Sequence, residues 1–431
     1  MPFDTARCFL FLQGPHGPFF DDLAGVLKEA GQQVHRISFN AGDERYWHHD
    51  CTPFTADKTD WAAYLDRFLD EHPVTDLVVY GDTRDIHAIA RAQARERGLR
   101  IHCFEEGYLR PYWITYERDG VNGNSRLMRM NVSEMRARMQ GRHVQVSDAP
   151  AQWGALWHHV LLGALYHAQV MFFNRRYRNF RPHRTISVRR EWRLYVRRLL
   201  LHPLYTVERR RESWKLRTSG ANYHLVLLQL AHDASFRDHS DFAHIGEFID
   251  LCCKGFARGA PRYHRLVFKT HPLEDGREPL RRLIRNAARR YGIQDRVQII
   301  RGGRLGEMLD NATTAVTVNS TAGQQVLWRG KPLKVFGRSV YSQPEFVSGQ
   351  PIDEFFANPH QPDRDAYILY RQFLLETSQF PGGFYTASGR ADAIRHVSEI
   401  ILRDIDPYDR KAALGTPRLA AGAAGRGRAN F

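Results

Sequence analysis

The 431-residue sequence contains little cysteine and none of the cysteine spacings that bind a metal or build a disulfide framework. Its five cysteines form no CxxC pair and no zinc-finger pattern: Cys8, Cys51, Cys103, Cys252 and Cys253. A sparse, odd count is typical of a reducing compartment. These absences argue against a structural metal site and against stabilisation by disulfides.

Long hydrophobic runs are also missing. No stretch reaches the ~20 apolar residues of a membrane span; the nearest, Trp157 to Phe173, contains three histidines. The apolar run near the N-terminus, Phe9 to Leu12, is too short for a signal peptide and is typical of a buried strand. The sequence therefore predicts a soluble, cytoplasmic protein.

Acidic residues are in deficit, with 47 Asp and Glu against 62 Lys and Arg, so the formal net charge is +15. This excess indicates an anionic partner, and nucleic acid, anionic lipid and a phosphorylated substrate all qualify. Hydrophobic residues at 43% and aromatic residues at 12% are typical of a globular protein. The length predicts two or three domains.

Strand and helix signals alternate in two stretches of the chain. The first has strands at 8–12, 33–39, 76–80 and 100–104, with helices at 19–30, 61–69 and 86–96. The second has strands at 223–228, 265–269, 297–300, 315–318 and 333–336, with helices at 245–256, 280–291, 305–311 and 322–328. This alternation predicts βαβ units and parallel sheets, and hence an α/β fold.

The predicted organisation has five parts: an N-terminal Rossmann-like domain (1–130), an Arg-rich helical segment (131–220), a second Rossmann-like domain (221–350), C-terminal helices packing across the domains (351–405) and a disordered tail (406–431). Two Rossmann-like domains followed by helices form the GT-B plan, with a central cleft. Open parallel sheets bind ligands at the carboxyl ends of their strands, so the chemistry is sought in those loops.

Basic residues concentrate in one segment, because Met171 to Arg217 holds fifteen Arg and Lys against three Glu. Aromatic residues such as Phe172, Phe173 and Tyr177 lie among them. Most charged runs are solvated surfaces, but helices of this composition also bind anionic bilayers or nucleic acid. Since the flanking domains are those of a small-molecule enzyme, the composition favours lipid.

Glu105 and Glu106 follow an apolar strand, and Gly107 permits a sharp turn after them. Adjacent carboxylates repel, which raises the pKa of one and separates a protonated group from an ionised one. Glycosyl transfer needs such a carboxylate as base or nucleophile. The structural alternative is a solvated turn in which Arg110 neutralises a glutamate.

Three groups of polar residues are candidates for binding a donor phosphate. Lys269, His271 and Pro272 end a predicted strand, and Pro272 biases His271 toward an extended backbone. Asn319, Ser320, Thr321 and Gly323 lie where a strand turns into a helix, which suits phosphate binding or ordinary helix capping. Gly323 would let a nucleotide approach the backbone, and Gln229 is either a donor contact or part of a surface turn.

The loops of the first domain supply candidates for the acceptor side. Gln13 and Gly14 lie in a loop without GxGxxG spacing, so the loop either lines the acceptor site or forms a rigid turn. Asp82 and Arg110 also follow predicted strands. No DxD motif is convincingly placed, so we expect catalysis without a divalent metal and without a cofactor.

These motifs, in this order, resemble the capsule polysaccharide biosynthesis and export proteins of the KpsS/LipB type. The matching stretches run from residue 11 to residue 341: FLQGPHGPFFDDLA, ISFNAGDERYW, VVYGDTRDIH, HCFEEGYLRPYWITYERDGVNGNS, LLQLAHDASFRDHS, VFKTHPLEDG and TVNSTAGQQVLWRGKPLKVFGRSVY. The Arg-rich segment and the tail match least.

The resemblance implies a retaining β-Kdo transferase with a GT-B-like fold. Such an enzyme uses CMP-Kdo to begin a poly-Kdo linker on lyso-phosphatidylglycerol, as a peripheral protein at the inner face of the cytoplasmic membrane. The resemblance maps the catalytic carboxylate to Glu106, where related enzymes often have Asp, and leaves nucleophile and base as alternatives. It maps the phosphate-binding His-Pro motif to His271 and Pro272, and the helix start to Ser320 and Thr321.

The expected partners are CMP-Kdo, an anionic phospholipid acceptor, the membrane surface and other capsule proteins, but not nucleic acid. Three further hypotheses stay open. One is a GT-B transferase that uses another nucleotide sugar, and another is a non-catalytic partner of capsule export. A nucleic-acid-binding protein is a third, which salt-sensitive DNA affinity would support.

Overall fold

A computed structural model of the chain describes residues 6–110, 112–140, 156–179, 188–230, 234–272, 274 and 276–409. These residues form two compact units. Unit 1 is drawn from residues 1–126, 141–184 and 372–430, and unit 2 from residues 127–140 and 185–371. Each unit is therefore built from segments that are far apart in the sequence.

A seven-stranded sheet in the order β12-β6-β5-β4-β1-β2-β3 forms the centre of unit 1. Its strands are β1 (Cys8–Phe11), β2 (Gln33–Ser38), β3 (Thr52–Pro53), β4 (Asp76–Tyr80), β5 (Arg100–Glu106), β6 (Trp113–Arg118) and β12 (Gln379–Pro381). The first five are parallel, whereas β6 runs antiparallel to β5 and β12 antiparallel to β6. The four predicted strands of this domain are confirmed.

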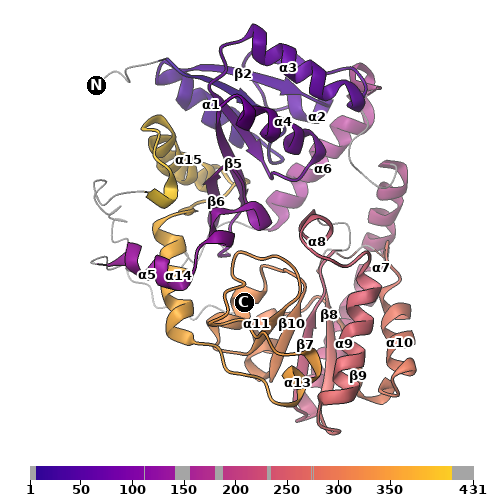
Figure 1. Ribbon diagram of the computed structural model, residues 1–431. Helices are drawn as coiled ribbons and strands as arrows, with labels where there is room; N and C mark the ends of the chain where they lie inside the picture. The colour runs from indigo at the N-terminus through magenta and orange to yellow at the C-terminus, as the bar shows by residue number, and fades with distance from the viewer. Residues whose placement is uncertain are drawn as a thin grey trace. The chain divides into compact units, whose positions relative to one another are not determined.

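Helices cover both faces of this sheet (Figure 1). Helices α1 (Phe19–Glu29) and α15 (Ala387–Leu402) share one buried core with the sheet, and α3 (Trp61–Glu71) and α4 (Asp85–Glu96) share another with its opposite face. In α1, Phe20, Leu23 and Leu27 are buried at the spacing of one helical face. The short helix α2 (Ala41–Glu44) follows β2. The layers are those of a Rossmann-like domain.

Unit 2 contains a five-stranded, fully parallel sheet in the order β11-β10-β7-β8-β9. Its strands are β7 (Tyr223–Leu227), β8 (Arg265–Thr270), β9 (Val297–Arg301), β10 (Thr314–Thr317) and β11 (Leu333–Val335). The connecting helices are α8 (Ala234–Asp238), α9 (Ile245–Gly259), α10 (Leu280–Arg290), α11 (Leu305–Asn311) and α12 (Gly323–Trp328). The predicted second Rossmann-like pattern is confirmed.

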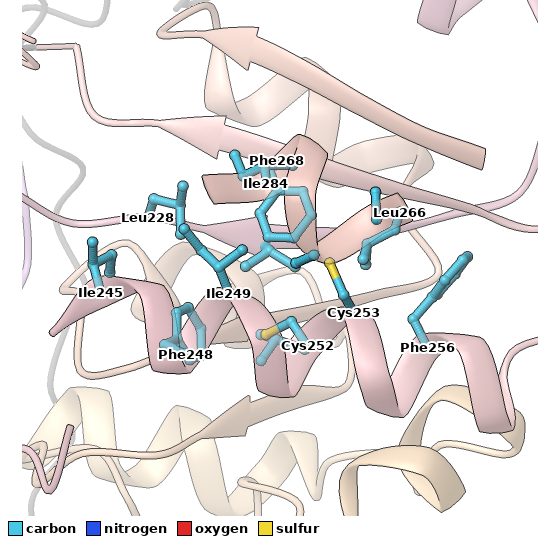
Figure 2. Close-up of a cluster of buried hydrophobic side chains, with 14 of the residues drawn as sticks. Leu228, Ile245, Phe248, Ile249, Cys252, Cys253, Phe256, Leu266, Phe268 and Ile284 are labelled. Carbon is cyan, nitrogen blue, oxygen red and sulfur yellow. The ribbon is translucent and has the colours of Figure 1, made fainter. Parts of the chain in front are cut away.

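Helix α9 supplies most of the buried core on one face of this sheet. Figure 2 shows Ile249 and Cys253 of α9 pointing toward Phe268 of β8 and Ile284 of α10. Helix α13 (Ile352–Ala357) packs on α9 and adds Phe355 and Phe356 to the same core. The apolar centre of β8, Leu266 to Phe268, is buried on both faces of the sheet, as is typical of a parallel sheet.

The basic segment forms helices that belong to different units. Helix α6 (Leu156–Phe173) lies in unit 1, whereas α5 (Val132–Met139) and α7 (Val188–Thr218) lie in unit 2. Helix α14 (Arg364–Glu376) carries the chain from unit 2 back to unit 1. Across the described ranges, none of the helices combines the length and the apolar character needed to cross a membrane.

The structure differs from the sequence-based expectations at three places. Strands β3, β6 and β12 were not predicted, and β5 continues to Glu106 instead of ending at residue 104, because β6 pairs with it from His102 to Glu106. Residues 406–409, assigned to the tail, include the 3-10 helix Pro407–Asp409, whose Asp409 pairs with Arg126. The rest of the predicted tail, 410–431, lies outside the described residues. The central cleft of the GT-B plan stays a prediction.

Candidate functional site

The two candidate catalytic carboxylates are the last two residues of β5. Glu105 lies opposite Thr115 and Glu106 opposite Ile114 of β6. They are therefore held by a sheet and not by a solvated turn. This position is the carboxyl end of a parallel strand, where α/β folds bind their ligands.

Two tyrosine hydroxyls donate to the same oxygen of Glu106. The Tyr80 hydroxyl, at the end of β4, lies 3.2 Å from Oε1, and the Tyr385 hydroxyl, in the segment before α15, lies 2.8 Å from it. Among the described residues, no hydrogen-bond donor reaches Oε2 of Glu106. One carboxylate oxygen is thus fixed in position while the other is available to a substrate.

Glu105, directly before Glu106 on β5, has a raised pKa. Burial raises the pKa of Glu105 to about 7, and the charge of Glu106 adds to this effect. Its Oε1 accepts a hydrogen bond of 2.9 Å from the backbone N–H of Glu106, and its Oε2 one of 3.3 Å from Asn122 Nδ2. The expected rise in one pKa of the pair is present, but burial is its larger cause.

Three aromatic side chains complete the surroundings of Glu106. Burial, together with the charge of Glu106, raises the pKa of Tyr80 and of Tyr385 well above the ordinary value, so both stay protonated and can donate. His159 of α6 stacks on Tyr385, with ring centroids 4.3 Å apart and planes 17° apart. Burial lowers the pKa of His159. The charge of Arg110 lowers this pKa further, whereas the charge of Glu106 raises it.

The turn after Glu106 depends on Gly107. A Cβ at this position would lie 2.2 Å from the backbone oxygen of Trp113, so the chain can return into β6 only with glycine here. Arg110 Nε donates to the Gly107 oxygen over 3.2 Å, and the Arg110 charge lowers the pKa of Glu105. Arg110 therefore acts electrostatically on Glu105, while Pro111 lies outside the described residues.

Gln13 connects the loop after β1 to the neighbouring polar residues. Its Nε2 donates to both carboxylate oxygens of Asp43 over 3.2 Å and to the Tyr166 hydroxyl over 3.0 Å. Its Oε1 accepts from Arg84 over 2.9 Å, and the Arg84 charge also acts on Glu105. The structure thus links Gln13 to the carboxylate pair through Arg84.

Asp82 and Gly14 have contacts that are structural. Asp82 is 1% exposed, and its Oδ2 accepts hydrogen bonds of 3.0 Å each from the Val121 N–H and Asn124 Nδ2. Arg91 lies 3.4 Å from the same oxygen. Gly14 is buried against the ring of Phe20. A direct contact of either residue with the acceptor stays a prediction.

In unit 2, Lys269 and His271 lie at the carboxyl end of β8. Lys269 is 7% exposed, and burial lowers its pKa to about 8. His271 is half-buried directly after the strand, and Pro272 is exposed. A cation and an imidazole therefore end the same strand, as the sequence predicts for a group that binds phosphate.

Gln229 and Asn319 pair with each other across the sheet. Gln229 Nε2 donates to Asn319 Oδ1 over 2.8 Å, and the Asn319 N–H donates to Gln229 Oε1 over 3.0 Å. Asn319 Nδ2 also donates to the backbone oxygen of His239, a buried residue that the sequence-based reasoning missed. This pair ties the loop after β7 to the loop after β10 and so shapes the predicted donor side.

The segment before α12 is a turn in which a serine hydroxyl accepts a backbone hydrogen bond, and no side chain of the described residues caps the helix itself. Ser320 Oγ accepts a hydrogen bond of 3.3 Å from the Ala322 N–H, and Thr321 is half-buried beside it. A Cβ on Gly323 would lie 2.4 Å from the Tyr341 hydroxyl oxygen. The glycine is therefore required by packing against Tyr341, a reason that differs from the predicted approach of a nucleotide.

Within the described part of the chain, no three His, Cys, Asp or Glu side chains gather in a way that could hold a metal ion. That the reaction needs no metal ion stays a prediction.

A sequence model described as "Capsule polysaccharide biosynthesis protein" matches residues 75–385, more than half of the chain. The protein belongs to this family. The matched range includes Glu105, Glu106, Lys269 and His271, whereas Gln13 lies before it.

Curated relatives match over most of their length. The chain is 30% identical to the capsule polysaccharide export protein KpsS of Escherichia coli over 384 residues, which covers 88% of this chain and 97% of that protein. It is also 30% identical to the capsule polysaccharide modification protein LipB of Neisseria meningitidis over 393 residues, covering 89% and 93%. A solved structure, the beta Kdo 2,7 transferase KpsC of Thermosulfurimonas dismutans, aligns with a TM-score of 0.45 and 11% identity over 92% of this chain and 100% of that one.

Proposed function

We propose that this protein is a glycosyltransferase of capsular polysaccharide biosynthesis. In this proposal it transfers β-Kdo from CMP-Kdo to lyso-phosphatidylglycerol and so starts a poly-Kdo linker at the inner face of the cytoplasmic membrane. Family membership and the curated name of LipB, a modification protein, support a role in building the polysaccharide. The name of KpsS, an export protein, keeps the non-catalytic alternative open.

The observation that carries the proposal is the arrangement around Glu106. Its Oε1 is held by the hydroxyls of Tyr80 and Tyr385, which leaves Oε2 for the substrate. A fixed carboxylate at the carboxyl end of a strand suits either nucleophilic attack on the anomeric carbon or removal of the acceptor proton. Glu105, with its pKa raised to about 7 by burial, limits the negative charge that the pair must carry.

The proposed donor side is at the carboxyl end of the unit 2 sheet. Lys269 and His271 would bind the phosphate of CMP, and the pairing of Gln229 with Asn319 would hold the neighbouring loop in place. In a nucleophilic mechanism, the bond from the anomeric carbon to the CMP oxygen breaks as Glu106 forms a covalent ester with the sugar. The acceptor hydroxyl then displaces Glu106, and its proton passes to a base or to water.

The direct test incubates the purified full chain with CMP-Kdo and lyso-phosphatidylglycerol and analyses the lipid by mass spectrometry. We expect a product heavier by one or more Kdo residues and the release of CMP. Thermal shift assays identify the donor class, because CMP is expected to raise the melting temperature and UDP is not. Stabilisation by UDP alone would favour the rival transferase, and retained capsule export in a Glu106→Ala strain would favour the non-catalytic partner.

The outward face of α7 supports the proposed membrane attachment. Leu200, Leu204, Val207 and Trp214 are 73%, 65%, 65% and 59% exposed, and their spacing places them on one side of the helix. Arg197 and Arg211 are exposed on that side as well. An apolar stripe among arginines complements an anionic bilayer, which attracts each basic residue by about 1 kcal/mol and accepts the apolar side chains at its interface.

Replacing Leu204 and Val207 together by Glu is expected to abolish binding to phosphatidylglycerol vesicles in a flotation assay. The change removes apolar area and adds negative charge, while both side chains already face solvent, so the melting temperature should change little. A matched control replaces Tyr263, 71% exposed in the loop before β8, by Glu. Equal vesicle binding by all three proteins would refute this attachment surface.

A further inference from the structure

The inner side of α7 carries a charge cluster at the carboxyl end of the unit 2 sheet. Glu208 of α7 forms an ion pair with Arg281, the second residue of α10, and its Oε2 lies 3.7 Å from Nε of Arg301, the last residue of β9. The guanidinium carbon of Arg301 also lies 4.3 Å from the ring centre of Tyr205. One carboxylate thus faces two guanidinium groups.

Positive charge is in excess within this cluster. Arg281 is affected by burial first and then by the charges of Arg301 and Arg285, all of which lower its pKa. Nε of Arg281 and Nε of Arg301 are buried, and neither has a hydrogen-bond partner among the described residues. Burying a hydrogen-bond donor of a cation costs free energy unless an acceptor pairs with it. The two carboxylate oxygens of Glu208 do not satisfy all the donors of the two guanidinium groups, so the cluster has room for an anion with more oxygens.

The cluster lies beside the proposed phosphate-binding residues. Thr270, which precedes His271, pairs with Arg301 in the parallel register of β8 and β9. The Gly302 N–H donates to the Thr270 oxygen over 3.2 Å, so the turns that follow the two strands run together. The Arg281 and Arg301 side chains are 40% and 27% exposed, so a small anion can reach them from solvent.

We propose that Arg281 and Arg301 form an oxyanion-binding site, and that Glu208 occupies it until a phosphate group displaces its carboxylate. Guanidinium groups bind phosphate through paired hydrogen bonds, and the two Nε atoms that make no hydrogen bond to the described residues offer donors for that geometry once Glu208 is displaced. The site deepens the proposed function, on which it rests, because it assigns two further residues to the anionic part of the donor. The same chemistry would also accept the phosphate of a lipid headgroup.

The experiment measures binding of inorganic phosphate to the full chain by thermal shift, at ionic strength matched with sodium chloride. Arg301→Gln is expected to weaken phosphate binding by ~10-fold or more, because a charge-assisted hydrogen bond is lost. Glu208→Gln is expected to have the opposite effect and to strengthen it, because the competing carboxylate is gone. Arg289→Gln, an exposed arginine of the same helix as Arg281, serves as the control and should bind as the wild type does.

A purely structural ion pair predicts a different pattern. In that case Glu208→Gln lowers the melting temperature, phosphate fails to restore it, and Arg301→Gln leaves phosphate binding unchanged; this pattern would overturn the proposal. CMP and glycerol phosphate, used as separate probes, identify the source of the anion, since the binding of the true ligand must depend on Arg301. If CMP-Kdo is not turned over yet phosphate binding follows the expected pattern, the transferase proposal fails and the site stands.

Discussion

Transfer of Kdo is expected to fall by ~10³-fold or more in Glu106→Gln, while the fold stays intact. The amide keeps the shape of the side chain, and its oxygen can still accept from Tyr80 and Tyr385 at the positions 3.2 and 2.8 Å away. What it loses is the negative charge on Oε2, which a nucleophile and a general base both require. The measurement is the initial rate of CMP release, together with the melting temperature of each variant.

Glu105→Gln is the matched control for this substitution. Burial raises the pKa of Glu105 to about 7, so this residue already carries a proton in much of the population near neutral pH, and its amide should cost far less activity. The activity of Tyr385→Phe should lie between the activities of Glu106→Gln and Glu105→Gln, since this change removes one of the two hydrogen bonds to Oε1 of Glu106. Normal turnover by Glu106→Gln would remove Glu106 from the mechanism.

Asp76→Ala is expected to lower the free energy of unfolding by about 3–5 kcal/mol, because it leaves a buried cation without its partner. Asp76 is fully buried at the start of β4 and accepts hydrogen bonds from Arg7 Nε over 2.9 Å and from His102 Nε2 over 2.8 Å. The Arg7 side chain is only 9% exposed, so water cannot replace the lost carboxylate. Urea denaturation followed by the fluorescence of Trp47 and Trp61 reports this change.

Acid should weaken the same network in the wild type. Burial lowers the pKa of His102 from 6.5 to about 4, so the unfolded chain binds a proton to this residue more readily than the folded chain, and stability falls between those two pH values. Burial opposes the ionisation of Asp76, but hydrogen bonds from His102 and Arg7 outweigh it and hold the pKa of Asp76 well below its ordinary value of 3.8. Its contribution is therefore lost as the pH falls below that value.

Asp70→Asn provides the comparison for Asp76. Asp70 pairs with Arg97 over 2.6 Å, but the two side chains are 63% and 30% exposed. Solvent screens such a pair, so its loss should change the unfolding free energy by only about 0–1 kcal/mol. If the Asp76 and Asp70 variants lost similar amounts of unfolding free energy, this would contradict the role assigned to the buried network.

The sequence predicted the parallel strands because each is a short apolar run next to a helix with one apolar face. Strand β1, for example, reads Cys-Phe-Leu-Phe and is buried at all four of its positions. Strand β6 has a mixed composition, Trp-Ile-Thr-Tyr-Glu-Arg, and β12 has only three residues, so neither carries such a pattern. Strand β6 follows β5 after a short turn, but Gln379 of β12 lies 264 residues beyond its partner Thr115 in β6, so no local window contains that second pairing.

Some residues of the candidate site could likewise be predicted from the sequence, and others could not. Glu106 could be found because it follows an apolar strand and precedes a glycine. Tyr385 could not, because it lies 279 residues further along the chain and reaches Glu106 only once the sheet has formed. The reason for Gly323 was likewise hidden, since nothing in the local pattern shows that Tyr341, 18 residues further along the chain, packs against it. Neighbours along the chain can be read from a sequence, whereas partners across the fold cannot.

Unit 1 combines early and late segments of the chain, so it cannot fold completely until the late segments have been synthesised. Strand β12, helix α15 and Tyr385 all come from the last part of the described chain, yet Phe380, Phe384 and Val397 belong to the same core as Phe9 and Phe11. The opening 126 residues therefore emerge with part of an apolar sheet face exposed, the part that β12 and α15 cover only after unit 2 has been synthesised, and such exposed surfaces favour aggregation. Glu106 gains its Tyr385 contact only afterwards, so no shorter nascent fragment forms both hydrogen bonds to Oε1 of Glu106.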